Sequence, residues 1–257
     1  MSGSNVAVIE PPRRGSAAEL SLLFCDPDIR PAMLALHAYR RDIDNAILRP
    51  ADPTVARAKL AWWGEELERL SRSVPRHPIT TSLVSRLSGD DVSRLAEYLL
   101  ASRHWQQGEP ATAEDFANFC DATGGNLAML ASAVAGTECA KSKADLRAAA
   151  RLLGSGIRAT ALIRLAVNSP LLQGRLTADD EDLTPLIEQS GRILRSGFEL
   201  MPESERIRQR GLLVMAGLHA RLLGRLSVAS TDCFAEVGPI RKLWTAWRVA
   251  RSLEYPR

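Results

Sequence analysis

Apolar residues recur along most of the chain at the three- and four-residue spacing of an amphipathic helix. Alternating runs of Val, Ile, Thr and Tyr, which are typical of strands, are almost absent. Helix starts are marked as well, because Asp52-Pro53 offers an N-cap followed by proline, and Thr112 with Asp115 resembles a capping box. The pattern therefore predicts an all-α protein.

The start and stop signals predict roughly eight to ten helices in one bundle. Their expected ranges are 29–48, 53–72, 78–87, 91–104, 112–124, 126–135, 142–167, a helix beginning at 184, 203–229 and 239–253. Only 170–182 is expected to be a long irregular segment. We expect a disordered lead over 1–17. Because no linker-like composition interrupts the chain after it, we expect a single helical domain over 18–257.

Composition and charge exclude several classes of protein. The chain has 257 residues, 46% of them apolar, and a net charge of +3, but residues 205–257 hold ten Lys or Arg against four Asp or Glu. No groove-reading or stacking motif accompanies this excess, so we expect no nucleic-acid partner. The four cysteines lack zinc-ligand spacing, and the longest uncharged stretch, 122–137, is too short to cross a bilayer. We expect a cytoplasmic protein, peripheral to the inner face of a membrane if its basic end contacts lipid.

Seven stretches carry a likeness to a known family. They are 35–44, 52–67, 77–78, 119–125, 153–164, 174–175 and 240–251. In this order and spacing they resemble the squalene/phytoene synthase family over about residues 18 to 253. The resemblance implies that family's fold, an isoprenoid-synthase-type helical bundle with a central cavity.

The resemblance also implies a chemistry that this chain departs from. In active members, two DxxxD motifs face each other and hold Mg²⁺ against substrate diphosphates, so that a prenyl cation can form. Here the first motif would begin at Asp44, but Leu48 follows four residues later, and Leu165 and Ser169 occupy the second. No two aspartates in the chain are four apart. We therefore expect no metal site and no cofactor, and Mg²⁺ only if the chain is an active enzyme.

Four arginines are candidates for binding an anionic head group in place of the metal. They are Arg41, Arg158, Arg164 and Arg175. A guanidinium can bind a phosphate through two parallel hydrogen bonds. The alternative is that they lie on the surface with only their stems buried. Arg164 and Arg175 fall on positions that match the family.

Asp44 and the pair Gly124-Gly125 are further candidates for ligand binding. Asp44 would be catalytic only if the chain is active; otherwise it is a helix carboxylate paired with Arg40 or Arg41. Gly124-Gly125 could kink a helix around a ligand, or could let two helices approach closely.

The last helix has the pattern of an interfacial helix. One face carries Ile240, Leu243, Trp244 and Trp247, with Arg241, Lys242, Arg248 and Arg251 largely around it. We take Trp244, Trp247, Arg241 and Lys242 as candidates for membrane contact. The alternative is that the apolar stripe packs onto the bundle, because any docked terminal helix shows such a stripe.

Three functions remain open. The first is an isoprenoid-binding protein or an accessory or assembly factor that has lost the Mg²⁺-diphosphate site. The family includes such a branch, an assembly factor of mitochondrial respiratory complex I that lacks intact acidic motifs. The second is an active prenyltransferase that joins two prenyl diphosphates head to head, using ligands such as Asp44 and Asp121. The third is a peripheral membrane or protein-interaction module that acts through the basic C-terminal helix. The expected partners are accordingly an isoprenoid or lipid ligand, a protein or a membrane surface.

Overall fold

The computed structural model describes residues 9–48, 52–107, 112–137, 140–167, 169–177, 182–227 and 237–256, and all regular secondary structure within these ranges is helical. The α-helices are α1 (Ala17–Leu22), α2 (Arg30–Leu48), α3 (Pro53–Ser71), α4 (Pro78–Leu83), α5 (Gly89–Gln107), α6 (Ala113–Cys120), α7 (Asn126–Ala135), α8 (Lys143–Ala166), α9 (Pro170–Thr177), α10 (Thr184–Leu200), α11 (Glu203–Arg206), α12 (Arg210–Leu226) and α13 (Pro239–Ser252). Two short 3₁₀ segments, η1 (Pro27–Ile29) and η3 (Ala140–Ser142), and one π-helical turn, η2 (Asp121–Gly125), complete the set. The all-α prediction is confirmed.

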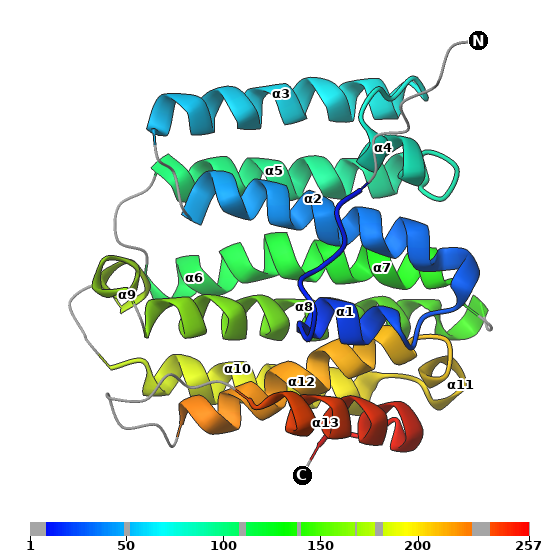
Figure 1. Cartoon of the computed structure of the whole chain (residues 1–257), viewed down its shortest axis with the longest axis vertical. Helices are drawn as coiled ribbons and strands as arrows, with labels where there is room; N and C mark the ends of the chain where they lie inside the picture. The colour runs from blue at the N-terminus through cyan, green and yellow to red at the C-terminus, as the bar shows by residue number, and fades with distance from the viewer. Residues whose placement is uncertain are drawn as a thin grey trace.

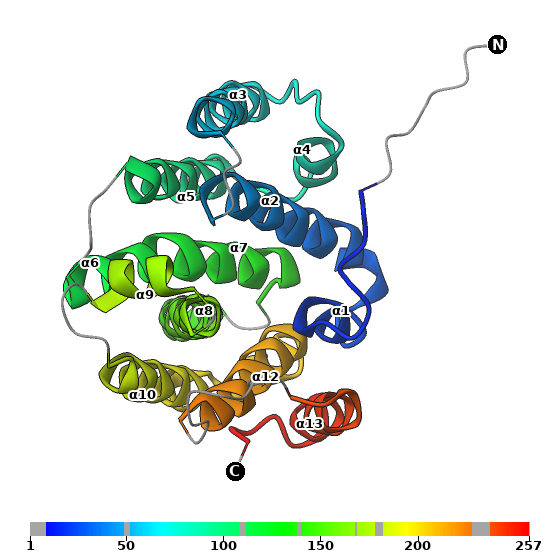
Figure 2. The ribbon, with the colours of Figure 1, turned by 60° about the vertical axis from the view of Figure 1, so that its left-hand side comes forward.

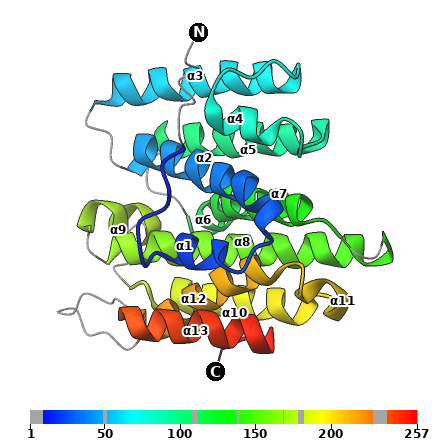
Figure 3. The same ribbon diagram turned by 45° about the vertical axis from the view of Figure 1, so that its right-hand side comes forward.

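Helix α8 lies in the middle of a layered bundle. Figure 1 shows α3 at one end of the molecule and α13 at the other, with α8 between them. Viewed nearly along α8, the neighbouring helices α7, α10 and α12 surround it (Figure 2). A third view keeps α3 and α13 at opposite ends (Figure 3). The central place of α8 brings residues from its middle turns close to several other helices at once.

Small residues let neighbouring helices approach α8 closely. A Cβ added at Gly124 would overlap the carbonyl oxygen of Gly154, and one added at Gly154 would overlap that of Gly124. A Cβ at Gly156 would lie 2.6 Å from Cγ of Leu194 on α10. Real side chains do not tolerate such distances, so glycine at these positions sets the spacing between the helices.

An aromatic cluster ties α2, α3 and α5 together. The rings of Tyr39 and Trp63 meet edge to face with centroids 4.9 Å apart, and the ring of Tyr98 lies 5.5 Å from that of Tyr39. The hydroxyl of Tyr39 donates to the carbonyl of Leu95 at 2.9 Å, and the indole N–H of Trp63 donates to Asp42 at 2.7 Å. These buried rings therefore keep their polar atoms hydrogen-bonded.

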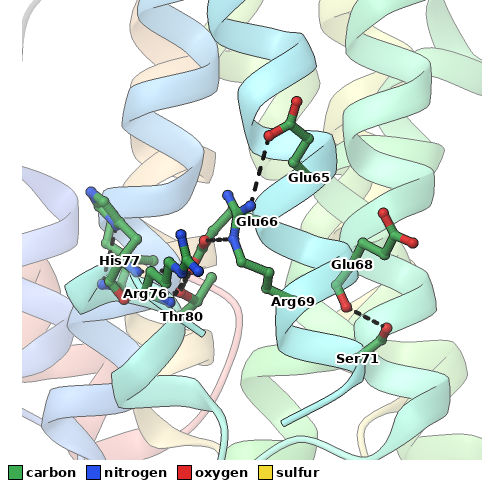
Figure 4. Close-up of polar contacts among 9 residues, drawn as sticks. Glu65, Glu66, Glu68, Arg69, Ser71, Arg76, His77 and Thr80 are labelled. Carbon is green, nitrogen blue, oxygen red and sulfur yellow. Dashed lines mark hydrogen bonds and ion pairs between the residues drawn. The ribbon is translucent and has the colours of Figure 1, made fainter. Parts of the chain in front are cut away.

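The turn between α3 and α4 is held by a buried carboxylate (Figure 4). Glu66 accepts hydrogen bonds from the backbone N–H groups of Arg76 and His77, both at 2.8 Å, and from the hydroxyl of Thr80. Arg69 pairs with its other oxygen at 2.8 Å. Burial favours a higher pKa for Glu66, but the hydrogen bonds outweigh it and lower the pKa to about 2.

Several predicted boundaries are correct and others are wrong. Asp52 caps α3 by accepting from Thr54 N–H, and Thr112 forms the capping box of α6. Residues 170–177 are helical, although 170–182 was expected to be irregular. In its described part, the helix expected over 203–229 is divided into α11 and α12. Gln209 lies in the turn between them and donates its amide N–H to the carbonyl of Gly136 at 3.0 Å.

The described part of the predicted lead, residues 9–17, contacts α2. Residues 1–8 lie outside the described residues. Arg41 donates to the carbonyls of Glu10 and Pro11, both at 3.2 Å, and pairs with the Glu10 carboxylate at 3.1 Å. Ser16 then caps α1 by accepting from Glu19 N–H. The division into a disordered lead and one domain stays a prediction.

Candidate functional site

A buried ion pair joins α2 to α8. Nη1 of Arg158 lies 2.7 Å from Oδ1 of Asp44 and 2.8 Å from Oδ2. The side chain of Arg158 is 2% exposed and that of Asp44 is 17% exposed. A guanidinium that leaves water needs a carboxylate partner, and α2 supplies it from 114 residues away in the sequence. Asp44 therefore pairs chiefly with Arg158, which the sequence did not indicate.

Two further side chains complete the surroundings of Asp44. Tyr98 on α5 donates its hydroxyl to Oδ1 at 3.3 Å. Nε of Arg40, one turn before Asp44 on α2, lies 3.6 Å from Oδ2. The predicted pairing of Asp44 with Arg40 thus exists, as a longer contact beside the shorter one to Arg158. Both carboxylate oxygens are engaged by protein donors.

The other side of the Arg158 guanidinium faces aromatic rings. Its Cζ lies 5.2 Å from the centroid of Phe119 on α6, and Phe119 stacks on Trp105 at 4.3 Å. Nε and Nη2 of Arg158 are buried and have no hydrogen-bond acceptor among the described residues. A cation over an aromatic face gains electrostatic attraction, which offsets part of the cost of those unmet hydrogen bonds.

The proton affinities fit a permanent ion pair. Burial works against the charged guanidinium, but the Asp44 carboxylate outweighs it and raises the pKa of Arg158 above its usual value. Burial, followed by the charge of Asp44, also raises the pKa of Tyr98. At neutral pH, Arg158 is therefore charged and Tyr98 is a hydrogen-bond donor.

These residues do not form a magnesium site. The positions of the second carboxylate in the first motif and of both carboxylates in the second hold Leu48, Leu165 and Ser169. Within the described ranges, no three His, Cys, Asp or Glu side chains come together in a group that could hold a metal ion. The only carboxylate at the expected place, Asp44, faces a guanidinium. Its donor set does not fit a hard divalent cation, which requires several oxygen ligands.

Asp121, the other ligand considered for an active enzyme, is engaged as well. Nε of Arg151 lies 2.8 and 3.0 Å from its two carboxylate oxygens, and Nη2 of Arg151 also contacts it. The hydroxyl of Ser155 donates to it at 3.1 Å. Asp44 and Asp121 are thus each paired with a different arginine of α8.

An apolar cavity of about 70 Å³ opens beside the ion pair. Helices α1, α2, α7, α8 and α12 contribute to its wall, with Arg40 and Arg158 among the few charged residues. Most of the wall is small or apolar: Cys25, Met33, Leu36, Gly124, Leu127, Ala128, Ala131, Ala135, Gly154, Ile157, Gly211, Leu212 and Met215. The small volume and the apolar lining suit a narrow hydrocarbon group whose polar end reaches the guanidinium groups.

A second hollow, of about 210 Å³, lies between residues 10–18 and α2. It shares His37 and Arg40 with the apolar cavity, and Asp44 and Arg41 also line it. Burial, aided by the charge of Arg40, lowers the pKa of His37 to about 3. Of the predicted residues, Arg41 and Asp44 thus line the same hollow, but Arg41 is already bonded to Glu10 and Pro11.

A third hollow, of about 320 Å³, is cationic. Arg13, Arg14, Arg164 and Lys242 line it, with His219, and none of the described residues that line it is acidic. Burial lowers the pKa of His219 to about 4, and the charges of Arg40 and Arg164 act in the same direction. The pocket therefore concentrates positive charge in a concave site, which favours binding of an anion such as a phosphate.

Gly124 and Gly125 lie in the π-helical turn η2, through which the helix continues into α7. Gly124 contacts α8 at Gly154, and Gly124 and Gly154 line the apolar cavity at that crossing. A Cβ on Gly125 would meet Asp121 and Ser155 at 3.0 Å. Of the two roles considered for this glycine pair, the structure shows the close approach of two helices, η2 and α8.

The remaining candidates belong to α9 and α13. Arg175 belongs to α9, and its side chain lies outside the described residues. Lys242 is half-buried and lines the cationic pocket, whereas Arg241 is exposed. Trp244 and Trp247 are exposed on the outer face of α13.

Among the site residues that sequence reasoning missed are Tyr98, Arg13, Arg14 and His219. Tyr98 looked like an ordinary core residue, and the arginines belonged to a segment expected to be disordered. The signals available in the sequence were the basic C-terminal end and the pair Arg13-Arg14, and nothing in the sequence indicated that these two segments meet.

The fold and the arrangement of the central helices define an isoprenoid-synthase-type bundle. The family model for squalene/phytoene synthase matches residues 12–177. Because this match covers more than half of the sequence, the chain belongs to the squalene/phytoene synthase family.

Two solved structures are similar to this one. A dehydrosqualene synthase in complex with a ligand has a TM-score of 0.73 and 18% identity, with 92% of this chain and 91% of that chain covered. The squalene synthase HpnC from Alicyclobacillus acidocaldarius has a TM-score of 0.61 and 15% identity, with 80% and 85% covered. At these identities the likeness shows the fold alone. No curated protein sequence matches the chain.

Proposed function

We propose that this chain is a member of the squalene/phytoene synthase family that binds an isoprenoid or a related lipid with an anionic head group, without the metal-dependent condensation. It acts as a lipid-binding accessory factor. The apolar cavity would take part of the hydrocarbon chain, and the cationic pocket would take the head group.

The pairing of Asp44 with Arg158 carries this proposal. In active members the facing helices present carboxylates to Mg²⁺, and here one helix presents a carboxylate and the other a guanidinium. Arg158 of α8 supplies the positive charge that a metal ion would bring next to Asp44. A cation added at this place would have to displace a buried arginine, which costs several kcal/mol, of the order of breaking a buried ion pair.

The neighbouring hollows support the choice of ligand. The apolar cavity, the hollow along α2 and the cationic pocket follow one another, because His37 and Arg40 line the first two and Arg13 and Ser16 line the last two. An amphiphile with an anionic end matches this order of apolar and cationic walls. The dehydrosqualene synthase of similar fold has itself been solved with a ligand bound.

Calorimetry with farnesyl diphosphate, in excess Mg²⁺ and again with EDTA, tests the proposal. We expect binding of similar affinity in both solutions, because arginine and lysine side chains do not need a metal to bind phosphate. In parallel, incubation with farnesyl or geranylgeranyl diphosphate and Mg²⁺ should give no head-to-head product.

Two results would contradict the proposal. Product formation at enzymatic rates, abolished by Asp44→Ala, would establish the chain as an active prenyltransferase. Binding that disappears with EDTA would show that a metal is required after all.

A further inference from the structure

The outer face of α13 is apolar and solvent-exposed. Ile240 is 87% exposed, Trp244 58% and Leu243 56%, and Trp247 is also exposed. The rings of Trp244 and Trp247 stack on one another with centroids 5.0 Å apart. Large apolar side chains gathered in this way on one helix are unusual on a protein surface and indicate an interaction site.

A different face of α13 packs onto the bundle. Thr245, Ala246, Val249 and Ala250 are its buried residues, and a Cβ on Gly217 of α12 would lie 2.7 Å from Val249. The tryptophan stripe is thus not the docking face, so the packing explanation for it is excluded by the exposure of these side chains.

The charge of α13 indicates what covers this face. The helix contains Arg241, Lys242, Arg248 and Arg251 and no acidic residue. Arg251 lies over the Trp247 ring at 5.5 Å, and Arg241 and Arg248 are exposed, so cations border the aromatic stripe. A second copy docked through the same face would place like charges against one another, which disfavours a dimer.

We propose that the outer face of α13 docks onto an anionic lipid bilayer, with Trp244 and Trp247 at the level of the head groups. Tryptophan favours the membrane interface, and basic side chains beside it are attracted by anionic lipids. No helix in the described part of the chain has the length and apolar character to cross a bilayer, so this contact would be peripheral.

Docking in this orientation also places the cationic pocket near the lipid surface. Pro239 and Lys242 of α13 line that pocket, together with Arg13 and Arg14. The docking itself does not require that the pocket binds a lipid, so the two proposals can fail independently.

Co-sedimentation with vesicles tests the docking. Vesicles of pure phosphatidylcholine are compared with vesicles that contain phosphatidylglycerol, at low and at high NaCl. We expect binding to the anionic vesicles only, and release at high salt, because exposed charges are screened over a shorter distance. The double variant Trp244→Ser/Trp247→Ser should bind at least tenfold more weakly, and Arg241→Gln/Arg248→Gln should lose the preference for phosphatidylglycerol.

The matched control is Trp62→Ser. Trp62 is a 40% exposed tryptophan on α3, at the opposite end of the molecule (Figures 1 and 3). This variant should bind vesicles like the unmodified chain, and circular dichroism should show all variants to be folded, because the changed side chains are exposed. Absence of binding at low salt, or equal binding by the Trp244/Trp247 variant, would overturn the proposal. A dimer in solution that this variant dissociates would overturn it too, because it would identify a second copy as the occupant.

Discussion

Arg158 and Asp44 meet in the interior, with Nη1 of the arginine within 2.8 Å of both carboxylate oxygens. This ion pair links α2 to α8. Because the pair is largely buried, its disruption should affect stability before it affects anything else.

Removal of Asp44 should be more harmful than removal of Arg158. Asp44→Ala leaves an uncompensated cation that is 2% exposed, which should lower the free energy of unfolding by about 3–5 kcal/mol. Arg158→Met should cost less, because the remaining carboxylate is partly exposed and keeps Tyr98 and Arg40. Urea unfolding monitored by circular dichroism measures both.

A double variant and a surface pair provide the controls. Asp44→Ala/Arg158→Met should be more stable than Asp44→Ala alone, because no unpaired charge remains buried. Asp121→Asn, which breaks the more exposed pair with Arg151, should cost about 1 kcal/mol or less. Equal losses for Asp44→Ala and Asp121→Asn would show that burial of the first pair has no energetic consequence.

The close contact between Gly124 and Gly154 should not tolerate a side chain on either residue. Gly124→Ala and Gly154→Ala each place a methyl group against the opposite backbone carbonyl, so we expect a loss of about 1–3 kcal/mol or failure to fold. Gly191→Ala on α10 is the matched control: nothing lies within 4 Å of its Cβ position, and alanine should stabilise the helix by about 0.5–1 kcal/mol. Thermal unfolding of the three variants checks this, and a neutral Gly124→Ala would contradict the close crossing.

Local signals in the sequence were sufficient to predict most helices but not to predict the contacts between them. Asp52 and Thr112 cap their helices as expected, because a cap depends on residues within one turn. The pairing of Asp44 with Arg158 spans 114 positions and depends on how α2 and α8 pack. Helical periodicity cannot identify such a partner.

The orientation of the last helix, α13, also could not be predicted from its periodicity alone. Two faces of this helix carry apolar residues at helical spacing. One face has large side chains and the other includes Ala246 and Val249. From the sequence alone, the face with the large side chains would be expected to be buried. The small residues are buried instead, since α12 presents Gly217 to Val249 and admits only a close approach. A stripe of small residues that can meet a glycine on another helix is the signal that was available.

Acid should destabilise the protein in the range where histidine titrates. The pKa of buried His219 is lowered from 6.5 to about 4, so the folded state binds a proton less readily than the unfolded state. Its contribution is complete above pH 6.5 and is lost as the pH falls toward 4, by about 2 kcal/mol between pH 7 and pH 5. Urea unfolding at both pH values should show a smaller loss for His219→Gln, whereas His104→Gln, an exposed residue on α5, should behave like the unmodified chain. An identical pH dependence in His219→Gln would exclude this residue as a source of the acid sensitivity.

At lower pH, protonation of Glu66 should be the next cause of lost folding stability. Its carboxylate has a pKa of about 2 against an ordinary 4.5, so the stability it contributes is present above pH 4.5 and is lost as the pH falls toward 2. Glu66→Gln removes the charge that Arg69 and two backbone N–H groups contact, and should cost about 3 kcal/mol at pH 7. The difference from the unmodified chain should shrink below pH 4 in acid titrations of stability. A constant difference down to pH 2 would contradict the assignment.

The cationic pocket should determine the affinity for the head group. On the proposed function, Lys242→Gln and the double variant Arg13→Gln/Arg14→Gln each remove positive charge from a pocket whose described lining residues include no acid. Each should weaken farnesyl diphosphate binding by about tenfold. Arg57→Gln, an exposed arginine on α3, removes the same charge far from the pocket and should leave the affinity unchanged. Calorimetry at two salt concentrations separates local from general effects, because the salt dependence should weaken only in the pocket variants. Equal losses for Arg57→Gln and Lys242→Gln would mean that net charge, not this pocket, attracts the ligand.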